Sequence, residues 1–191
     1  MNEHHLTYLA SDEWAERLAT DLLPWVERVA ELGGDVLEVG PGPGRTDLLR
    51  TRCDTVTAVE LDADLASALR ERTAGTNVEV FEADAADTGL ADGRFSVAAA
   101  FSVLHHVPTV EHQDRVFAEL ARVLRPGGAL LISDAVDHEV LREYHHDDTF
   151  VPIDLLTVAD RLGRVGFTDV VVEATDYEFR LHARRATVAA S

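Results

Sequence analysis

Short apolar runs that alternate with helical segments constrain the fold of this chain more than any other feature of its sequence. From residue 35 onward, apolar runs alternate with segments of helical spacing. The runs are Val36–Val39, Thr55–Val59, Val78–Phe81, Phe95–Phe101 and Ala129–Ile132. Repeated strand–helix alternation is typical of a mostly parallel sheet with helices on both faces. We therefore expect a doubly wound α/β fold.

The two ends of the chain depart from this alternation. Val170–Val172 and Tyr177–Ala183 are joined by a short link, and the second run alternates apolar and polar residues as a strand does. We expect them to add an antiparallel hairpin, which makes a seven-stranded sheet. The N-terminal segment has apolar residues at helical spacing, and Pro24 breaks it or opens a second helix. We expect one domain over residues 1–191, with 1–32 as a helical cap over the pocket.

Three later segments carry separate expectations. Residues 111–124 have the apolar spacing of an amphipathic helix, ended by a turn at Pro126–Gly128 before the fifth strand. The polar residues 137–149 favour a solvated lid loop. Residues 153–165 predict a last helix, with Gly166 at its end.

The net charge of the chain limits the binding partners that we expect. The chain has 35 acidic residues and 17 basic ones, which gives a formal net charge of -18. Such a surface repels phosphate backbones and anionic membranes, so we expect neither nucleic acid nor membrane as a partner. Neither a leader-like N-terminal pattern nor an apolar run of about 20 residues is present, so we expect a cytoplasmic protein. Oligomeric state is not decided by any sequence feature.

A glycine-rich segment follows the first strand directly. Glycines at positions 40, 42 and 44 remove side chains where backbone has to pass close to a ligand. Glu60 ends the second strand about 20 residues past Gly40, a spacing suited to binding both hydroxyls of a ribose. A dinucleotide loop would need a further glycine at position 45, where this chain has Arg45.

This order of motifs resembles the class I S-adenosylmethionine-dependent methyltransferases. The similarity covers roughly residues 30 to 185. Its motifs are Val36–Gly44, Val59–Asp62, Glu82–Ala85, Phe95–His106, Leu124–Gly128 and Gly166–Phe167. The resemblance implies S-adenosylmethionine as cofactor, with S-adenosylhomocysteine as product. It also implies a set of cofactor-binding residues, which are Glu38, Gly40, Gly42, Gly44, Glu60, Leu61, Asp84, Ala85 and Phe101.

The resemblance gives several of these residues a role. Glu38 would orient the loop and approach the methionine ammonium, which the Phe101 carbonyl would also meet. Glu60 would accept hydrogen bonds from both ribose hydroxyls. Leu61 would cover the adenine face, and Asp84 would accept from the adenine amino group.

Two histidines are candidates for proton transfer. Methyl transfer is an in-line displacement at the sulfonium methyl, and it needs a base only when the acceptor is protonated. His105 and His106 follow the fourth strand, so we assign His105 as the candidate catalytic residue. The alternative is that one of the two packs locally and the other faces solvent. Histidines and aspartates also crowd residues 138–148, but adjacent residues rarely converge on one ion, so no metal is expected.

Motifs that the sequence lacks narrow the class of methyl acceptor. The fourth strand ends in Phe101-Ser102, without the Asn/Asp-Pro-Pro-aromatic run of nucleobase-amine enzymes or the carboxylate of catechol-type enzymes. A small organic acceptor is therefore the leading class, with a protein side chain as the alternative acceptor. A nicotinamide-dependent oxidoreductase would explain the glycine loop and Glu60, but not Asp84. A non-catalytic cofactor-binding module also stays open, because function depends on the site and not on the fold.

Overall fold

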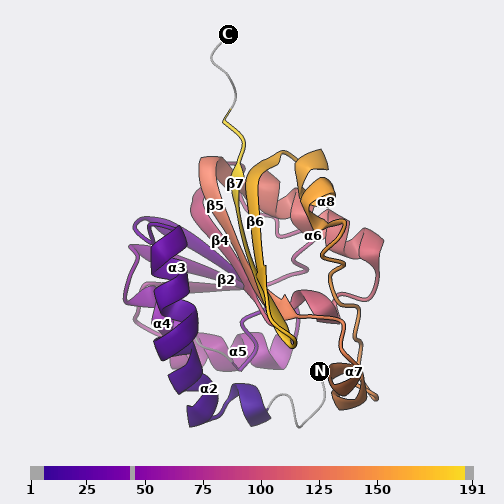
Figure 1. Cartoon of the computed structure of the whole chain (residues 1–191). Helices are drawn as coiled ribbons and strands as arrows, with labels where there is room; N and C mark the ends of the chain where they lie inside the picture. The colour runs from indigo at the N-terminus through magenta and orange to yellow at the C-terminus, as the bar shows by residue number, and fades with distance from the viewer. Residues whose placement is uncertain (1–6, 44–45, 188–191) are drawn as a thin grey trace.

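A computed structural model describes residues 7–43 and 46–187 of the chain, so the prediction for Gly44 lies outside the described residues. Seven strands form one sheet in the order β3-β2-β1-β4-β5-β7-β6 (Figure 1). All neighbours are parallel except the β5–β7 and β6–β7 pairs. The strands are β1 Asp35–Val39, β2 Thr55–Glu60, β3 Val78–Glu82, β4 Phe95–Phe101, β5 Leu124–Ala135, β6 Phe167–Ala174 and β7 Glu178–Arg185. The predicted doubly wound fold with its antiparallel C-terminal hairpin is confirmed.

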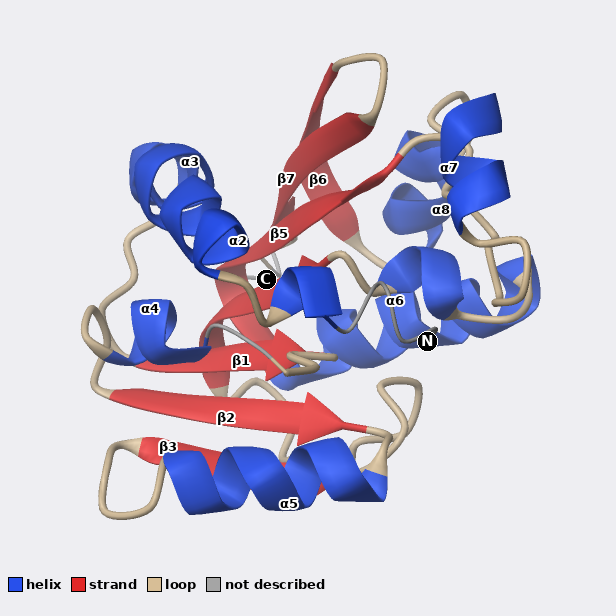
Figure 2. Cartoon of the chain, turned by 90° about the horizontal axis from the view of Figure 1, so that it is seen from below, coloured by secondary structure: helices blue, strands red, loops and turns tan. Residues whose placement is uncertain are grey.

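Helices cover both faces of this sheet. In Figure 2, α2, α3 and α4 lie on one side, and α6, α7 and α8 lie on the other. The helices are α2 Asp12–Arg17, α3 Leu23–Val29, α4 Thr46–Arg50, α5 Ala63–Arg72, α6 Val110–Val123, α7 Glu139–Tyr144 and α8 Val158–Arg164. A π-helical turn, Leu18–Leu22, joins α2 to α3, and a 3-10 turn, Leu104–His106, follows β4.

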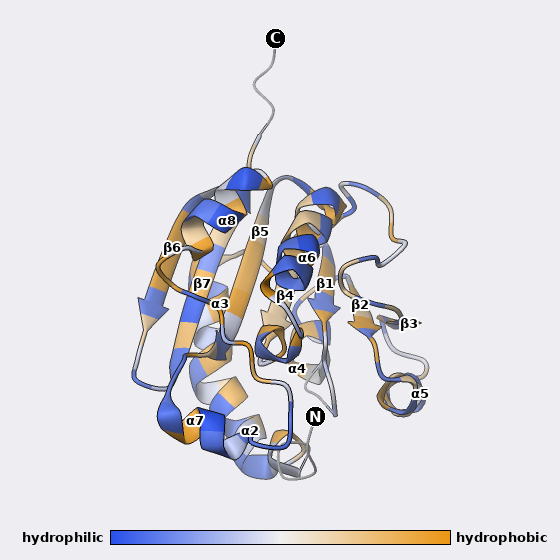
Figure 3. Ribbon diagram, turned by 90° about the vertical axis from the view of Figure 1, so that its right-hand side faces the viewer, coloured by the Kyte–Doolittle hydropathy of each residue, from blue (hydrophilic) through white to orange (hydrophobic). Residues whose placement is uncertain are grey.

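Alternation along the central strands builds two cores. On β4, Val97 and Ala99 pack with the N-terminal helices, whereas Ala98 and Ala100 pack with α6 and α8. Successive side chains of a strand point to opposite faces, so a strand covered on both faces has to be apolar throughout. Figure 3 shows this most clearly on β5, whose ribbon is largely hydrophobic, whereas the ribbons of α6 and α8 mix hydrophobic and hydrophilic residues.

Particular residues mark the starts of α3 and α5. Pro24 stands in the first turn of α3, and the N–H of Leu23 before it bonds to the Leu18 carbonyl five residues back. Pro24 therefore marks the change from the π-helical turn to α3, as the prediction of a second helix required, but the chain stays helical through it. Asp62 caps α5, accepting hydrogen bonds from the N–H groups of Asp64 and Leu65.

Two predicted boundaries were wrong. The turn at Pro126–Gly128 lies inside β5, because Leu124 already pairs with Phe95 before Ala129 pairs with Val97. The segment is therefore a bulge within the strand. The last helix begins at Val158 and not at residue 153. Asp154 holds the chain in a turn, since its side chain accepts from the Leu156 N–H and the Thr157 hydroxyl.

The expectation of a solvated loop over residues 137–149 was also wrong in part. This segment contains the helix α7, whose N-cap is His138, with its Nδ1 accepting from the Val140 N–H. The residue that follows α7, His145, is buried. Among the described residues, no helix is long and apolar enough to cross a membrane.

Parallel strands bring their carboxyl ends to one edge of the sheet. Gly40 follows β1, Glu60 ends β2, Phe101 ends β4 and Asp134 lies near the end of β5. Ligands of open α/β sheets bind in the crevice outside these strand ends. The fold therefore gathers residues from four distant parts of the sequence at one place.

Candidate functional site

Most predicted cofactor residues meet at a cleft of about 460 Å³ along this edge. Its walls include Gly40, Glu60, Leu61, Asp84 and Ala85. A neighbouring apolar cavity of about 40 Å³ shares Gly40 with the cleft and is lined in addition by Glu38 and Phe101. Gly42 lines neither cavity, but its backbone N–H donates to the side chain of Glu60.

The side chain of Glu60 is held in place by backbone. Its Oε2 accepts from the Gly42 N–H at 2.9 Å, and its Oε1 accepts from the Asp62 N–H at 3.0 Å. Each carboxylate oxygen can accept a second hydrogen bond, so capacity remains for donors in the cleft. Glu60 thus links the glycine loop to the end of β2 in a fixed orientation.

Glu38 is buried at the centre of the same edge. Its Oε2 accepts from the hydroxyl of Thr46 at 2.7 Å, and Thr46 is fully buried at the start of α4. Sequence reasoning missed Thr46. Its only signal was a hydroxyl residue at the start of the helix that follows the glycine loop.

Asp84 is paired with a histidine on α6. The Oδ1 of Asp84 accepts from the Ala86 N–H at 2.8 Å, and the Nε2 of His112 lies 2.9 Å from Oδ2. Burial opposes ionisation of Asp84, but the Ala86 hydrogen bond and His112 outweigh it and lower the pKa of this carboxyl. His112 also lines the cleft, and sequence reasoning missed it.

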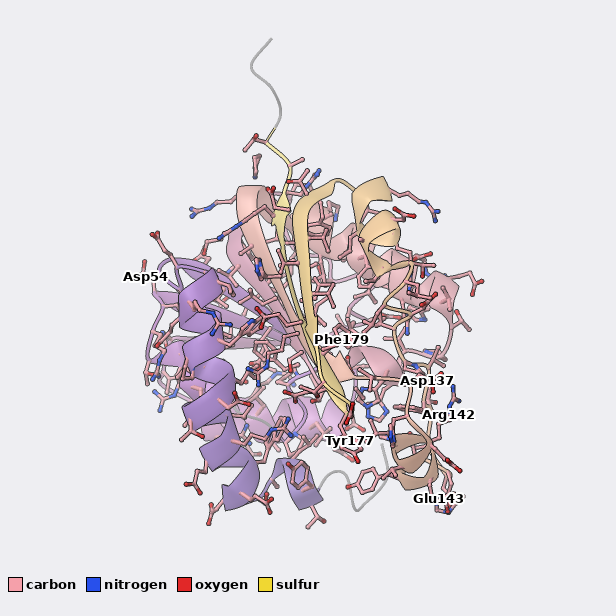
Figure 4. All side chains as sticks on the ribbon, viewed as in Figure 1. Asp54, Asp137, Arg142, Glu143, Tyr177 and Phe179 are labelled. Carbon is pink, nitrogen blue, oxygen red and sulfur yellow. The ribbon has the colours of Figure 1, made fainter. Side chains whose placement is uncertain are left out.

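Besides the small apolar cavity, a larger second cavity of about 320 Å³ lies beside the cleft. Four tyrosine and tryptophan side chains from three segments line it together with polar groups, and these are Tyr8, Trp14, Tyr144 and Tyr177. In Figure 4, Tyr177 lies at the tip of the β6–β7 hairpin, on the side of the molecule where α7 carries Arg142 and Glu143. The cavity is therefore enclosed by the N-terminal segment, α7 and the C-terminal hairpin.

His105 lines this second cavity and is 2% exposed. Its Nδ1 is hydrogen-bonded to Oδ1 of Asp134, a carboxylate that also accepts from the N–H groups of Leu104 and Ala135 at 2.7 Å. Burial alone would raise the pKa of Asp134, but His105 and the two backbone donors lower it. A carboxylate facing Nδ1 fixes the proton there and leaves Nε2 as the basic nitrogen.

Sequence reasoning missed Asp134, although its position just after the apolar part of β5 was a usable signal. The alternative in which one neighbouring histidine faces solvent does not hold for the pair after β4. The side chain of His106 is 14% exposed, and the two rings lie 4.1 Å apart between centroids. His106 lines the cofactor cleft, so consecutive residues face two adjacent cavities.

Several known proteins with similar sequences are methyltransferases. The chain is 31% identical over 160 residues to the 27-O-demethylrifamycin SV methyltransferase of Amycolatopsis mediterranei, covering 81% of this chain and 53% of that protein. It is 27% identical over 134 residues to the probable tRNA methyltransferase 9B of Bos taurus, covering 70% of this chain and 28% of that protein. The chain thus spans about a quarter to about a half of the length of these relatives.

Solved structures share the fold. The PH0226 protein from Pyrococcus horikoshii OT3 superposes with a TM-score of 0.77 at 20% sequence identity, and the match covers 92% of both chains.

The residues at the edge fit the cofactor of such proteins. Glu60 offers acceptors for ribose hydroxyls, and Leu61, 70% exposed, offers an apolar surface for a base. The model of the methyltransferase domain family matches residues 37–132, which span β1 to the middle of β5. This chain belongs to the methyltransferase domain family, and S-adenosylmethionine is its cofactor.

Proposed function

We propose that the chain transfers the methyl group of S-adenosylmethionine to a small organic acceptor by in-line displacement. The cofactor supplies a methyl group already activated on a sulfonium sulfur. The residues proposed to hold it are Glu38, Gly40, Gly42, Gly44, Glu60, Leu61, Asp84, Ala85 and Phe101. The protein's own task is then to align the acceptor and to remove its proton where it carries one.

The hydrogen-bonded pair of His105 and Asp134 carries this proposal. It lies in the wall of the second cavity, next to the cleft, and both side chains are buried. We assign His105 as the base: Nε2 takes the proton of the acceptor, and the carboxylate of Asp134 stabilises the imidazolium that forms. The proton is thus held at Nε2 of His105 until it is released to solvent.

The second cavity favours an acceptor with an aromatic or apolar body and a protonated oxygen or nitrogen. Tyr8, Trp14, Tyr144 and Tyr177 supply apolar surface, and Arg17 at the same wall is already paired with Glu178. The acceptor named by the rifamycin relative is also a small molecule. The name of the other relative points to tRNA, but a formal net charge of -18 disfavours a polyanion.

We also propose that residues 1–32 cover the acceptor, as part of one domain over 1–191. Leu9 and Trp14 line both the small apolar cavity and the second cavity. The segment is fastened to the C-terminal hairpin by Arg17 with Glu178 and by Asp21 with Arg180. Both ends of the chain would therefore shape the acceptor pocket.

The test is formation of S-adenosylhomocysteine from S-adenosylmethionine across a panel of phenols, alcohols, carboxylic acids, amines and tRNA. We expect turnover with at least one small acceptor, loss of turnover in His105→Ala, and normal turnover in His146→Ala, whose side chain is 66% exposed. Methylation of tRNA alone would contradict the proposed acceptor class. Cofactor binding without turnover on any acceptor would favour a non-catalytic module.

A further inference from the structure

Three histidines from two segments meet between the cofactor cleft and the second cavity. His105 and His106 belong to the 3-10 turn after β4, and His145 follows α7. One ring nitrogen of each lies within 4.8 Å of those of the other two. This trio differs from the crowded residues 138–148, where His146 turns outward toward Asp147 and only His145 is buried.

The hydrogen bonds of the three rings share one pattern. Nδ1 of His145 lies 2.7 Å from the Leu141 carbonyl oxygen, and Nδ1 of His106 lies 3.2 Å from the Thr149 carbonyl oxygen. Nδ1 of His105 faces the carboxylate of Asp134. Carbonyl and carboxylate oxygens only accept, so each Nδ1 carries a proton, and in the neutral ring each Nε2 carries the lone pair.

Metal-binding histidines show the same arrangement. A ligating imidazole almost always donates its other N–H to a carboxylate or a backbone carbonyl, which fixes the tautomer and the ring orientation. Here a carboxylate serves one ring and backbone carbonyls serve the other two.

The spacing of the rings also suits one ion. Zinc binds imidazole nitrogen at about 2 Å, which places the centroids of three rings around it about 5 Å apart. The observed centroid distances are 4.1 Å between His105 and His106, 5.0 Å between His105 and His145, and 5.5 Å between His106 and His145. Small rotations of the side chains would bring the nitrogens together.

We propose that His105, His106 and His145 form a binding site for one divalent transition-metal ion, with zinc the expected metal. Three imidazole ligands leave one coordination position open, as in zinc sites that bind a water or a substrate. His106 lines the cofactor cleft, while His105 and His145 line the second cavity, so that position lies at their boundary. A bound ion takes the Nε2 lone pair of His105, so the proposed proton abstraction belongs to the ion-free protein.

The test uses untagged, full-length protein stripped of metal by a chelator and titrated with Co²⁺, read by the visible absorption of tetrahedral cobalt. We expect one equivalent to bind and Zn²⁺ to displace it. His145→Gln and His106→Gln should each weaken binding by roughly 100-fold or more. His146→Gln and His138→Gln should bind as the wild type does. Melting temperatures of all variants check that they are folded.

Two results would overturn the proposal. One is the absence of stoichiometric binding by the wild type. The other is binding that survives in His145→Gln but is lost in a His4→Ala/His5→Ala variant, which would place the ion at the N-terminal histidines. Because the readout is metal binding and not turnover, failure here leaves the proposed methyl transfer untouched.

Discussion

A β-carbon at residue 40 would overlap Cγ2 of Val103, so Val103 fills the space that only a glycine leaves open. Gly40 also has a φ of 62°, in the left-handed region. The glycine was expected to make room for a ligand, and the structure adds a second reason within the protein itself. The loop after β1 and the segment after β4 are therefore packed against each other at the centre of the site.

Replacing Gly40 by alanine should destabilise the protein by about 2–4 kcal/mol, from overpacking and from left-handed strain together. Urea unfolding measures this. Gly75→Ala is the control, since Gly75 has a φ of 76° but nothing within 4 Å of an added β-carbon. Adding Val103→Ala should restore part of the loss. Equal destabilisation by Gly40→Ala and Gly75→Ala would show that Val103 does not limit this position.

The buried pair of Asp134 and His105 should govern turnover. Asp134→Asn removes the charge that stabilises the imidazolium, so kcat should fall by roughly 100-fold or more. Cofactor affinity should hardly change, because Asp134 does not line the cleft. Asp137→Asn is the matched control, at an exposed aspartate paired with Arg142. A loss of cofactor binding that matches the loss of kcat would mean that the residue acts on the fold instead.

Acid stability should depend on Glu119. Arg122 and Thr88 bind its carboxylate and lower its pKa to about 2. A depressed pKa gives a stabilisation that is complete above the unfolded value near 4.5 and is lost as pH falls toward 2. Glu119→Gln should therefore flatten the decline in stability between pH 4.5 and 2, measured by urea unfolding at each pH. The exposed Glu71→Gln should leave the decline as steep as in the wild type.

Cys53 should react slowly with alkylating reagents. Burial, followed by Asp54 and Asp35, raises the pKa of its thiol to about 11, and its Sγ lies 3.1 Å from the Leu49 carbonyl oxygen. At this pKa, the thiolate fraction at pH 8 is roughly 100-fold below that of an ordinary cysteine. Because only the thiolate reacts, the rate of alkylation should fall by a similar factor. Mass spectrometry of iodoacetamide-treated protein checks this. Alkylation as fast as that of free cysteine would show that the thiol is open to solvent.

Sequence patterns predicted the order of elements and the loops at the strand ends. Apolar runs that alternate with helices favour a mostly parallel sheet, and the carboxyl ends of parallel strands lie at one edge. Gly40, Glu60 and Asp84 therefore lie at that edge. These residues could be named because each adjoins a strand end.

What the sequence could not provide were partners formed by tertiary packing. Val103 meets Gly40, Thr46 binds Glu38, and His112 reaches Asp84 from a helix far along the chain. The 3-10 turn that orients His105 and His106 is held by the hydrogen bond from the Leu104 N–H to Asp134, and no local sequence pattern predicts it. The late start of the last helix likewise follows from a local side-chain turn at Asp154, which competes with helix formation.

The most direct test of the account is a calorimetric titration of the wild type, Glu60→Ala and Glu82→Ala with S-adenosylmethionine, S-adenosylhomocysteine and NADH. We predict saturable binding of both sulfur compounds and none of NADH. Glu60→Ala should weaken binding by roughly 10- to 100-fold, because charge-assisted hydrogen bonds are lost. Glu82→Ala, at an exposed glutamate outside the cleft wall, should bind normally. Binding of NADH alone, or equal affinities in all three proteins, would contradict the account.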